Sequence, residues 1–317
     1  MVRELIVLGS ASQVPTRQRN HNGYLLRWDG ETILFDPGEG TQRQFLFAGV
    51  SIARVSRICV THFHGDHCLG LPGILQRLSL DAVKRPVSVA FPASGAPYFE
   101  RLRHASAFDD RVTIVPVPVS PPSDGTLVAV PARTGGPSSD GRAPALFAAA
   151  LRHGIDTIGW RVEEPNGRTM LPDRLAAAGV RGPDITRLQL EGAVVVDGRR
   201  VTLEEMSVAR RGQRVAVVMD TEWCDGARSL AHDVDLLVCE STFAHAEHEL
   251  AESWGHMTAA QAGRLAAESG ARTLVLTHFS ERYHDVAPLV EEARSAFDGP
   301  VVAAIDLMRV PVPRRRA

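Results

Sequence analysis

Four side chains that bind divalent metal ions fall within six residues of this chain: His62, His64, Asp66 and His67. The apolar residues Ile58 and Val60 before them are typical of a short buried strand, and Gly65 permits a tight turn. We expect the turn to direct the first two histidines at one point and Asp66 with His67 at a second point nearby. Imidazole and carboxylate together suit zinc and similar ions. Histidines at this density do not pack well without a shared cation, so a capping or surface role is not favoured.

Further candidate ligands stand where other apolar runs end. Asp220 follows the run 215–219, Glu240 follows the run 234–239, and His278 follows Thr277. The tetrapeptide 276–279 resembles 60–63, since both contain Thr-His-Phe, and this hints at an internally duplicated sandwich. His153, in its Arg-His-Gly context, is as compatible with a hydrogen-bonded core histidine as with a ligand.

The segment 62–67 is similar to the HxHxDH motif of the metallo-β-lactamase superfamily. This resemblance implies an α/β fold, a four-layer αββα sandwich, with a two-metal site at one end of its sheets. It also implies a ligand set, in which one ion is held by His62, His64 and His153, a second by Asp66, His67 and His278, and both by Asp220. The expected cofactor is two Zn²⁺ per subunit, with Mn²⁺ or Fe²⁺ as alternatives.

Such a site favours hydrolysis of an anionic ester. Two divalent cations bring four positive charges and the two carboxylates remove two, so the site attracts an anion. Zinc lowers the pKa of bound water to roughly 7, and two ions stabilise both oxygens of a phosphodiester displacement. The superfamily assigns to Asp66 the orientation or deprotonation of the attacking water. We expect His256, which lies just before a helix start, to protonate the leaving oxygen, and Glu240 to support its charged form; a surface role for His256 is the alternative.

The elements that must position these residues can be predicted from hydrophobic periodicity. Strands are expected over 4–9, 23–28, 32–36, 87–90, 214–219, 234–240 and 273–277, with a hairpin turn at Asp29-Gly30. Helices are expected over 69–80 and 258–269, and the second has a capping box of Thr258 and Gln261 and a stop at Gly270. The turn 36–40 either braces the metal loop or only changes the chain direction.

Residues 163–198 interrupt the strand rhythm, with a short helix near 173–178. Between Arg161 and Arg214, ten Arg stand against eight Asp and Glu, an excess of two, and a solvated excursion explains that composition without RNA. The expected domains are a core first half over 1–162, an inserted arm over 163–198 and a core second half over 199–317. The Pro-, Gly- and Ser-rich stretch 120–145 is expected to be a surface hairpin or loop of unassigned role.

Composition excludes several classes of protein. With 317 residues, 44% hydrophobic and 23% charged, the chain is an ordinary globular protein. It has no apolar run of signal-peptide or membrane-span length, so we expect a cytoplasmic protein with no membrane partner. Its four cysteines show no CxxC pair, and a net charge of −2 argues against bulk attraction to DNA or RNA, leaving local patches for any RNA contact.

Several further segments resemble the ribonuclease Z family over nearly the whole chain. They are Pro15-Thr16-Arg17-Gln18-Arg19-Asn20, residues 34–42, 61–73, His153-Gly154 with 159–162, Glu240-Ser241-Thr242-Phe243, His256-Met257-Thr258 and residues 276–283. The resemblance implies cleavage of precursor tRNA on the 3′ side of the discriminator nucleotide, leaving a 3′-hydroxyl on the tRNA and a 5′-phosphate on the trailer. It also implies that the arm grips the tRNA and that the protein is a homodimer.

Three positions depart from the family pattern: Arg17 replaces a common Lys, Met257 a common Ser, and Glu222 a common basic residue. A carboxylate at 222 would repel an RNA phosphate. Two other functions stay open on sequence alone. One is a small-molecule phosphodiesterase or arylsulfatase-like hydrolase of the same superfamily, which would not need an arm; the other is a metal-free RNA-binding protein, which the intact ligand set makes unfavourable.

Overall fold

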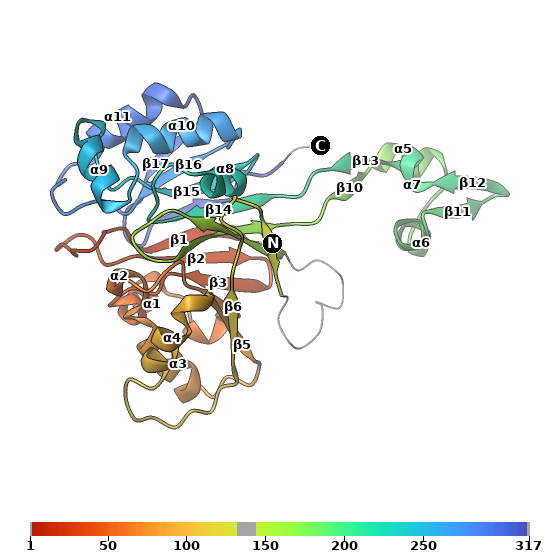
Figure 1. Cartoon of the computed structure of the whole chain (residues 1–317). Coiled ribbons are helices and arrows are strands. Elements are labelled where there is room, and N and C mark those ends of the chain that lie inside the picture. The colour runs from red at the N-terminus through yellow and green to blue at the C-terminus, as the bar shows by residue number, and fades with distance from the viewer. Residues whose placement is uncertain (1, 132–143, 316–317) are drawn as a thin grey trace. The chain divides into compact units, whose positions relative to one another are not determined.

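The structure is a computed structural model that describes residues 2–131 and 144–315 (Figure 1). The chain divides into two compact units. The larger is formed by Met1–Glu163 and Arg214–Pro313, and the smaller is formed by the inserted stretch Glu164–Gln213 with the end of the chain. The insertion therefore leaves the larger unit after one strand and returns at the start of the neighbouring strand.

In the described part of the chain, two seven-stranded sheets form the centre of the larger unit. The first sheet has the order β18-β1-β2-β3-β4-β5-β6, and its strands are β1 Arg3–Gly9, β2 Gly23–Trp28, β3 Glu31–Phe35, β4 Arg57–Cys59, β5 Val87–Pro92, β6 Ile114–Val119 and β18 Arg309–Pro311. The second sheet has the order β17-β16-β15-β14-β9-β8-β7, with β7 Val128–Val130, β8 Ala145–Leu151, β9 Thr157–Glu163, β14 Arg214–Val218, β15 Leu236–Glu240, β16 Leu274–Thr277 and β17 Val301–Ala303.

Helices cover the outer face of each sheet (Figure 1). The first sheet is covered by α1 Thr41–Ala48, α2 Gly65–Cys68, α3 Leu71–Leu80 and α4 Ala96–Arg103, with short 3₁₀ turns at Ile52–Arg54 and Ala93–Gly95. The second is covered by α8 Asp225–Ala231, α9 His248–Trp254, α10 Ala259–Ser269 and α11 Ala287–Ala296, with a 3₁₀ turn at His245–Glu247. The predicted four-layer αββα sandwich is confirmed.

The alternation of side chains along β1 shows how the layers are held. Leu5 and Val7 belong to the core that includes residues of both sheets, whereas Ile6 and Leu8 belong to the core beneath the first sheet's helices. Because successive side chains of a strand point to opposite faces, a strand buried on both faces reads as a continuous apolar run. This burial makes the sheets a rigid support for the loops at their ends.

Most predicted elements are confirmed at or near their predicted bounds. β2 and β3 form the hairpin turned at Asp29, which has a positive φ of 53°. Helix α10 has the predicted capping box, in which the Thr258 side chain accepts from Gln261 N while the Gln261 side chain accepts from Thr258 N, and it ends at Gly270 in the left-handed conformation. The predicted helix over 69–80 is shorter at its start, because α2 takes the residues up to Cys68 and α3 begins at Leu71.

The two sheets repeat one pattern of strand pairing. Along β1 to β6 the successive pairs are two antiparallel and three parallel, and the same series recurs along β8, β9, β14, β15, β16 and β17. This pattern agrees with the hint of internal duplication. The Thr-His-Phe segments are not equivalent within it, however, since His62 follows β4, the second parallel strand, and His278 follows β16, the third. The equivalent positions are instead Asp36 after β3 and Asp220 after β14, with φ of 45° and 40°.

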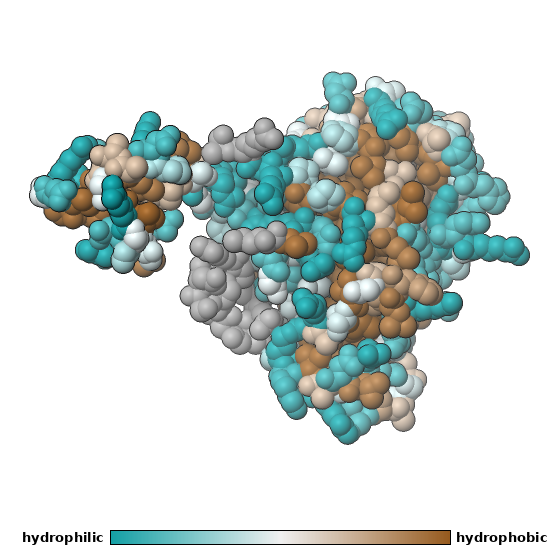
Figure 2. Space-filling model, turned by 180° about the vertical axis from the view of Figure 1, so that it is seen from behind, coloured by the Kyte–Doolittle hydropathy of each residue, from teal (hydrophilic) through white to brown (hydrophobic). Residues whose placement is uncertain are grey.

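The smaller unit has its own hydrophobic core, which includes Leu175, Leu188 and Val201. It contains the strand pairs β10 Gly167–Met170 with β13 Ser207–Arg210 and β11 Ala193–Val196 with β12 Arg199–Thr202, and the helices α5 Pro172–Ala177, α6 Pro183–Glu191 and α7 Leu203–Met206. The predicted arm 163–198 covers only its first part, since the unit continues to Gln213. Its surface in Figure 2 is mixed hydrophilic and hydrophobic, and Leu190 and Val195 are exposed.

Three smaller expectations can be compared with the structure. The stretch 120–145 falls partly outside the described residues, and its described flanks pair as an antiparallel hairpin of β7 and β8. All four cysteines are free, and Cys224 alone among them is half-buried. None of the helices in the described part of the chain combines the length and apolar composition needed to cross a lipid bilayer.

Candidate metal centre

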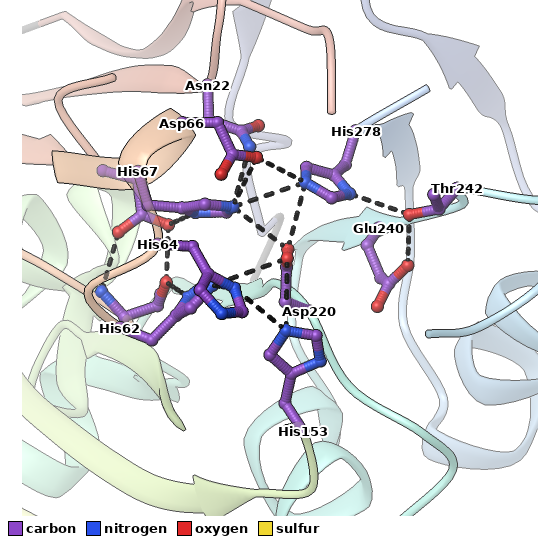
Figure 3. Close-up of polar contacts among 12 residues, drawn as sticks. Asn22, His62, His64, Asp66, His67, His153, Asp220, Glu240, Thr242 and His278 are labelled. Atoms are coloured by element: carbon purple, nitrogen blue, oxygen red, sulfur yellow. Dashed lines mark hydrogen bonds and ion pairs between the residues drawn. The ribbon is translucent and has the colours of Figure 1, made fainter. Parts of the chain in front are cut away.

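The candidate ligands gather where the parallel strands of both sheets end. His62 follows β4, Asp220 follows β14 and His278 follows β16, while His153 lies in the turn between β8 and β9. Asp220 and His278 both have positive φ, at 40° and 60°. A residue other than glycine is rarely found there, and such strain concentrates at functional sites. Figure 3 shows the labelled side chains pointing from these elements toward one another.

The first donor set consists of three imidazoles and a carboxylate. His64 Nδ1 lies 3.0 Å from His62 Nε2 and 3.3 Å from His153 Nε2. Asp220 Oδ2 lies 3.6 Å from His62 Nε2 and 3.8 Å from His153 Nε2. The ligand atoms of these side chains all lie within 4.8 Å of one another.

The second donor set uses the other oxygen of Asp220. Asp220 Oδ1 lies 3.3 Å from His67 Nε2 and 3.2 Å from His278 Nε2. Asp66 Oδ2 lies 3.3 Å from His67 Nε2 and 3.4 Å from His278 Nε2. All seven residues predicted as metal ligands are therefore brought together, and Asp220 belongs to both sets.

These distances fit divalent metal ions. Zinc bonds of about 2.0–2.1 Å in tetrahedral geometry place neighbouring ligand atoms roughly 3.3–3.4 Å apart. Asp220 Oδ1 is buried without a hydrogen-bond donor, which is costly for a carboxylate oxygen that has no cation to coordinate. The residues present thus fit a divalent metal centre.

Hydrogen bonds set the tautomer of the ligand histidines. The Thr61 hydroxyl donates to Asp36 Oδ2 at 2.7 Å, so it accepts from His62 Nδ1 at 3.0 Å. His67 Nδ1 donates to the same Asp36 oxygen at 2.8 Å. In both rings Nδ1 is therefore occupied by this partner, and Nε2 is the nitrogen that faces the other donors and can bind a metal. Asp36 therefore braces the metal loop, which was one of the two interpretations of the turn 36–40.

An equivalent relay exists in the second half of the unit. The Thr242 hydroxyl donates to Glu240 Oε2 at 2.6 Å and accepts from His278 Nδ1 at 2.7 Å. His153 Nδ1 donates to the Gly255 carbonyl at 2.9 Å. The sequence analysis missed the roles of Thr61, Thr242 and Gly255. The hydroxyl pair has a weak sequence signal, a threonine just after a strand in each half, whereas a backbone carbonyl has none.

Burial favours the neutral ligand form of His62 and His64. It is the main cause that holds the pKa of His62 well below its ordinary value, and it lowers the pKa of His64 as well. At His67 burial is outweighed by the nearby aspartates, which raise its pKa well above its ordinary value, so that ring must lose a proton to bind a metal. Burial opposes ionisation of Asp220, but the adjacent His278 and His67 rings outweigh it and hold the pKa of Asp220 well below its ordinary value. Neutral imidazole and ionised carboxylate are the forms that bind a metal.

The metal loop is positioned by close backbone packing against the turn that follows β3. A Cβ on Gly38 would lie 2.1 Å from the carbonyl oxygen of Asp66 and 2.7 Å from that of Asn22. No side chain fits there without moving the backbone. Glycine at position 38 therefore allows the turn to pack directly against the backbone of Asp66.

His256 lies next to the donor sets, and its Nδ1 is 3.0 Å from Glu240 Oε1. Its ring centre is 5.0 Å from that of His153 and 5.4 Å from that of His278. Burial would lower the pKa of His256, but the Glu240 carboxylate outweighs it and raises that pKa to about 9. Glu240 is fully buried and in contact with His256, so it can stabilise the protonated ring as expected from the sequence.

The three departures from the family pattern have different surroundings. Arg17 is exposed and Met257 is fully buried in the core. Glu222 Oε2 lies 3.8 Å from Arg152 Nη1, and its backbone N–H donates to the Arg152 carbonyl at 2.8 Å. The negative charge at 222 is therefore accompanied by a cation from the residue before His153, which reduces the repulsion expected from the sequence.

The chain was compared with known proteins. A sequence model described as the metallo-beta-lactamase superfamily matches residues 16–140, and one described as a beta-lactamase superfamily domain matches residues 184–279. The chain is 55% identical to ribonuclease Z of Salinispora arenicola, covering 99% of this chain and 97% of that protein. It is 53% identical to ribonuclease Z of Streptomyces avermitilis, covering 99% of each.

Among solved structures, human tRNase Z, short form, aligns with a TM-score of 0.68 and 24% identity, covering 98% of this chain and 100% of that one. At this identity the structural likeness establishes the fold alone. The relatives of higher identity extend over nearly the whole sequence, including both donor sets and the insertion. The chain therefore belongs to the ribonuclease Z family of the metallo-β-lactamase superfamily.

Proposed function

We propose that this protein is an endoribonuclease that cleaves precursor tRNA on the 3′ side of the discriminator nucleotide. The tRNA keeps a 3′-hydroxyl and the released trailer carries a 5′-phosphate. One observation supports this most: two donor sets share the two oxygens of Asp220. The full-length relatives named ribonuclease Z identify the class of diester.

The cofactor we propose is two Zn²⁺ per subunit, with Mn²⁺ or Fe²⁺ as alternatives. His62, His64, His153 and Asp220 would hold one ion, and Asp66, His67, His278 and Asp220 the other. A pair of such ions supplies a nucleophile from water near neutral pH and charge neutralisation at the phosphate. The first set has three imidazoles and one carboxylate, the second has two of each, and both sets suit zinc.

Asp66 is the residue we propose to orient or deprotonate the attacking water. Burial would raise the pKa of Asp66, but the nearby His67 outweighs it and holds that pKa below its ordinary value. The carboxylate is therefore ionised, the form that can accept a hydrogen bond from the attacking water. The backbone of Asp66 packs against the Gly38 turn and its side-chain Oδ2 lies against His67 and His278, so both ends of the residue are positioned.

His256 is the residue we propose to protonate the leaving oxygen, which is O3′ of the discriminator nucleotide. Its Nδ1 faces Glu240, so Nε2 is the nitrogen available to the substrate. Glu240 is a positioning residue, because it stabilises the charged ring and keeps its orientation. His256 lies beside both donor sets, as a proton donor to the scissile bond must.

The smaller unit is proposed to bind the tRNA away from the cleavage site. Eight Arg and seven Asp or Glu lie within 164–213, so binding there depends on local placement of cations and not on bulk charge. The protein is further proposed to be a cytoplasmic homodimer, as the family resemblance implies. The relatives give no support to the alternative of a small-molecule phosphodiesterase or arylsulfatase-like hydrolase.

Incubation of the pure zinc-loaded protein with a precursor tRNA tests this function. A single cut just after the discriminator nucleotide, with a 3′-hydroxyl on the tRNA, is the expected product. The Asp66→Ala variant should bind the RNA with little change and leave it uncut. A ladder of cuts along the tRNA, or an Asp66→Ala variant as active as the wild type, would overturn the proposal.

A further inference from the structure

An aromatic side chain lies inside the metal loop itself. Phe63 stands between the ligands His62 and His64, in non-helical chain before α2. Its ring is half-buried and packs against the turn Ala93–Gly95, since a Cβ on Gly95 would lie 2.1 Å from Phe63 Cε2. It also meets the buried Phe91 edge-on, with ring centres 5.8 Å apart and planes at 76°. One part of the metal loop is thus fixed by aromatic packing.

A second aromatic ring continues this packing to the protein surface. Tyr98 of α4 is stacked on Phe63, with ring centres 5.8 Å apart and planes at 28°. It is 52% exposed, whereas its neighbour Phe99 is buried against Phe91. The guanidinium of Arg101, one helical turn further on, lies 5.5 Å from the centre of the Tyr98 ring. The result is an exposed aromatic stack with a cation beside it.

The stack is connected to the metal centre through the metal loop and through the turn that Phe63 contacts. The turn Ala93–Gly95, which Phe63 contacts, contributes Ala93 and Ser94 to a cavity of about 550 Å³. His153, a ligand of the first donor set, lines the same cavity. Phe63 therefore joins the stack to the metal loop, and the turn that it packs against lines a cavity that is also lined by one metal ligand, His153.

We propose that Phe63, Tyr98 and Arg101 form a stacking platform for an unpaired nucleobase of the substrate RNA beside the scissile phosphate. This inference rests on the proposed function. Aromatic rings bind unpaired bases regardless of sequence, and an arginine adds cation–π and phosphate contacts. The RNA on both sides of the cut is single-stranded, so the base belongs to the discriminator side or to the trailer, and the experiment separates the two.

Kinetics with altered RNA test the platform. Two precursor tRNAs are prepared, one with an abasic nucleotide just before the cut and one with an abasic nucleotide just after it. Both RNAs and the unmodified RNA are cleaved by the wild type and by Tyr98→Ala. Loss of one stacked base costs about tenfold in affinity, so Tyr98→Ala should raise KM about tenfold with little change in kcat. For the abasic RNA that lacks the stacked base, Tyr98→Ala should not raise KM further. The position of the abasic nucleotide in that RNA then identifies the stacked base.

Matched variants separate stacking from loss of structure. Tyr98→Trp and Tyr98→Phe keep a ring and should retain the wild-type KM to within about twofold. Trp254→Ala removes another exposed aromatic ring, 65% exposed on α9, and should have no effect. Quenching of 2-aminopurine at the named position, in RNA with an uncleavable linkage, should be strong with the wild type and weak with Tyr98→Ala.

The outcomes distinguish this inference from the proposed function. If the wild type cuts precursor tRNA correctly and Tyr98→Ala has the wild-type KM on every RNA, the platform is wrong and the function stands. If the effects of Tyr98→Ala and of each abasic nucleotide on log KM are additive, no base stacks on Tyr98 and the platform is again wrong. If the wild type does not cut precursor tRNA, the proposed function fails first.

Discussion

The substitution Gly38→Ala should disable the centre through a backbone shift alone. The added Cβ would lie 2.1 Å from the Asp66 carbonyl oxygen, and ordinary contact begins at 3.4 Å, so the two segments must separate by about 1.3 Å (3.4 − 2.1). Catalytic groups must be held within about 0.5 Å of their productive positions. A displacement of about 1 Å costs roughly a hundredfold in rate. We therefore expect kcat/KM for precursor tRNA to fall about a hundredfold or more.

The assay combines cleavage kinetics with zinc content and circular dichroism at matched protein concentration. Gly30→Ala is the matched control, because a Cβ there meets nothing within 4 Å, and it should keep wild-type activity. The reasoning is refuted if Gly38→Ala is folded, binds zinc normally and cleaves within about twofold of the wild type. The Gly38 turn would then be free to move without carrying Asp66 with it.

Three more substitutions or deletions probe other parts of the account. Thr242→Val removes the hydroxyl between His278 and Glu240 and should weaken zinc binding about 10–100-fold in a chelator competition, and unchanged affinity would contradict the relay. His256→Gln should slow single-turnover cleavage about 10²–10⁴-fold while atomic absorption finds the wild-type metal content, and full activity would exclude it as the proton donor. Replacing residues 164–213 by a short turn should abolish cleavage of precursor tRNA but keep hydrolysis of a small phosphodiester. The core should still fold, because Glu163 of β9 and Arg214 of β14 are paired neighbours that a short turn can connect. Survival of both activities would contradict tRNA binding by the smaller unit.

The local part of the site was predictable from the sequence, and the long-range part only partly. His62, His64, Asp66 and His67 are adjacent in the chain, so their density alone indicates a metal. Asp220 and His278 are recognisable because each follows an apolar strand, and the ends of parallel strands meet at one edge of a sheet. His153 has no such signal, and the structure shows its second nitrogen held by the Gly255 carbonyl, about a hundred residues away in sequence.

The end of the smaller unit was also beyond the sequence pattern. The two ends of the smaller unit are joined by a bidentate ion pair. Arg210, at the end of β13, donates from Nη1 and Nη2 to the two carboxylate oxygens of Glu164, which precedes β10, at 3.0 and 2.9 Å. Such a contact between distant residues leaves no periodic trace in the sequence. Residues 199–213 were therefore assigned to the second half of the core, although they belong to the smaller unit.

The central claim is that Asp220 joins two donor sets into a paired cation centre. Native mass spectrometry of the zinc-saturated protein measures this most directly, as the number of ions retained per subunit. We predict two for the wild type and a loss of tightly bound zinc in Asp220→Ala, because that variant removes an oxygen from each set. One ion or none in the saturated wild type, or two undiminished ions in Asp220→Ala, would contradict the account.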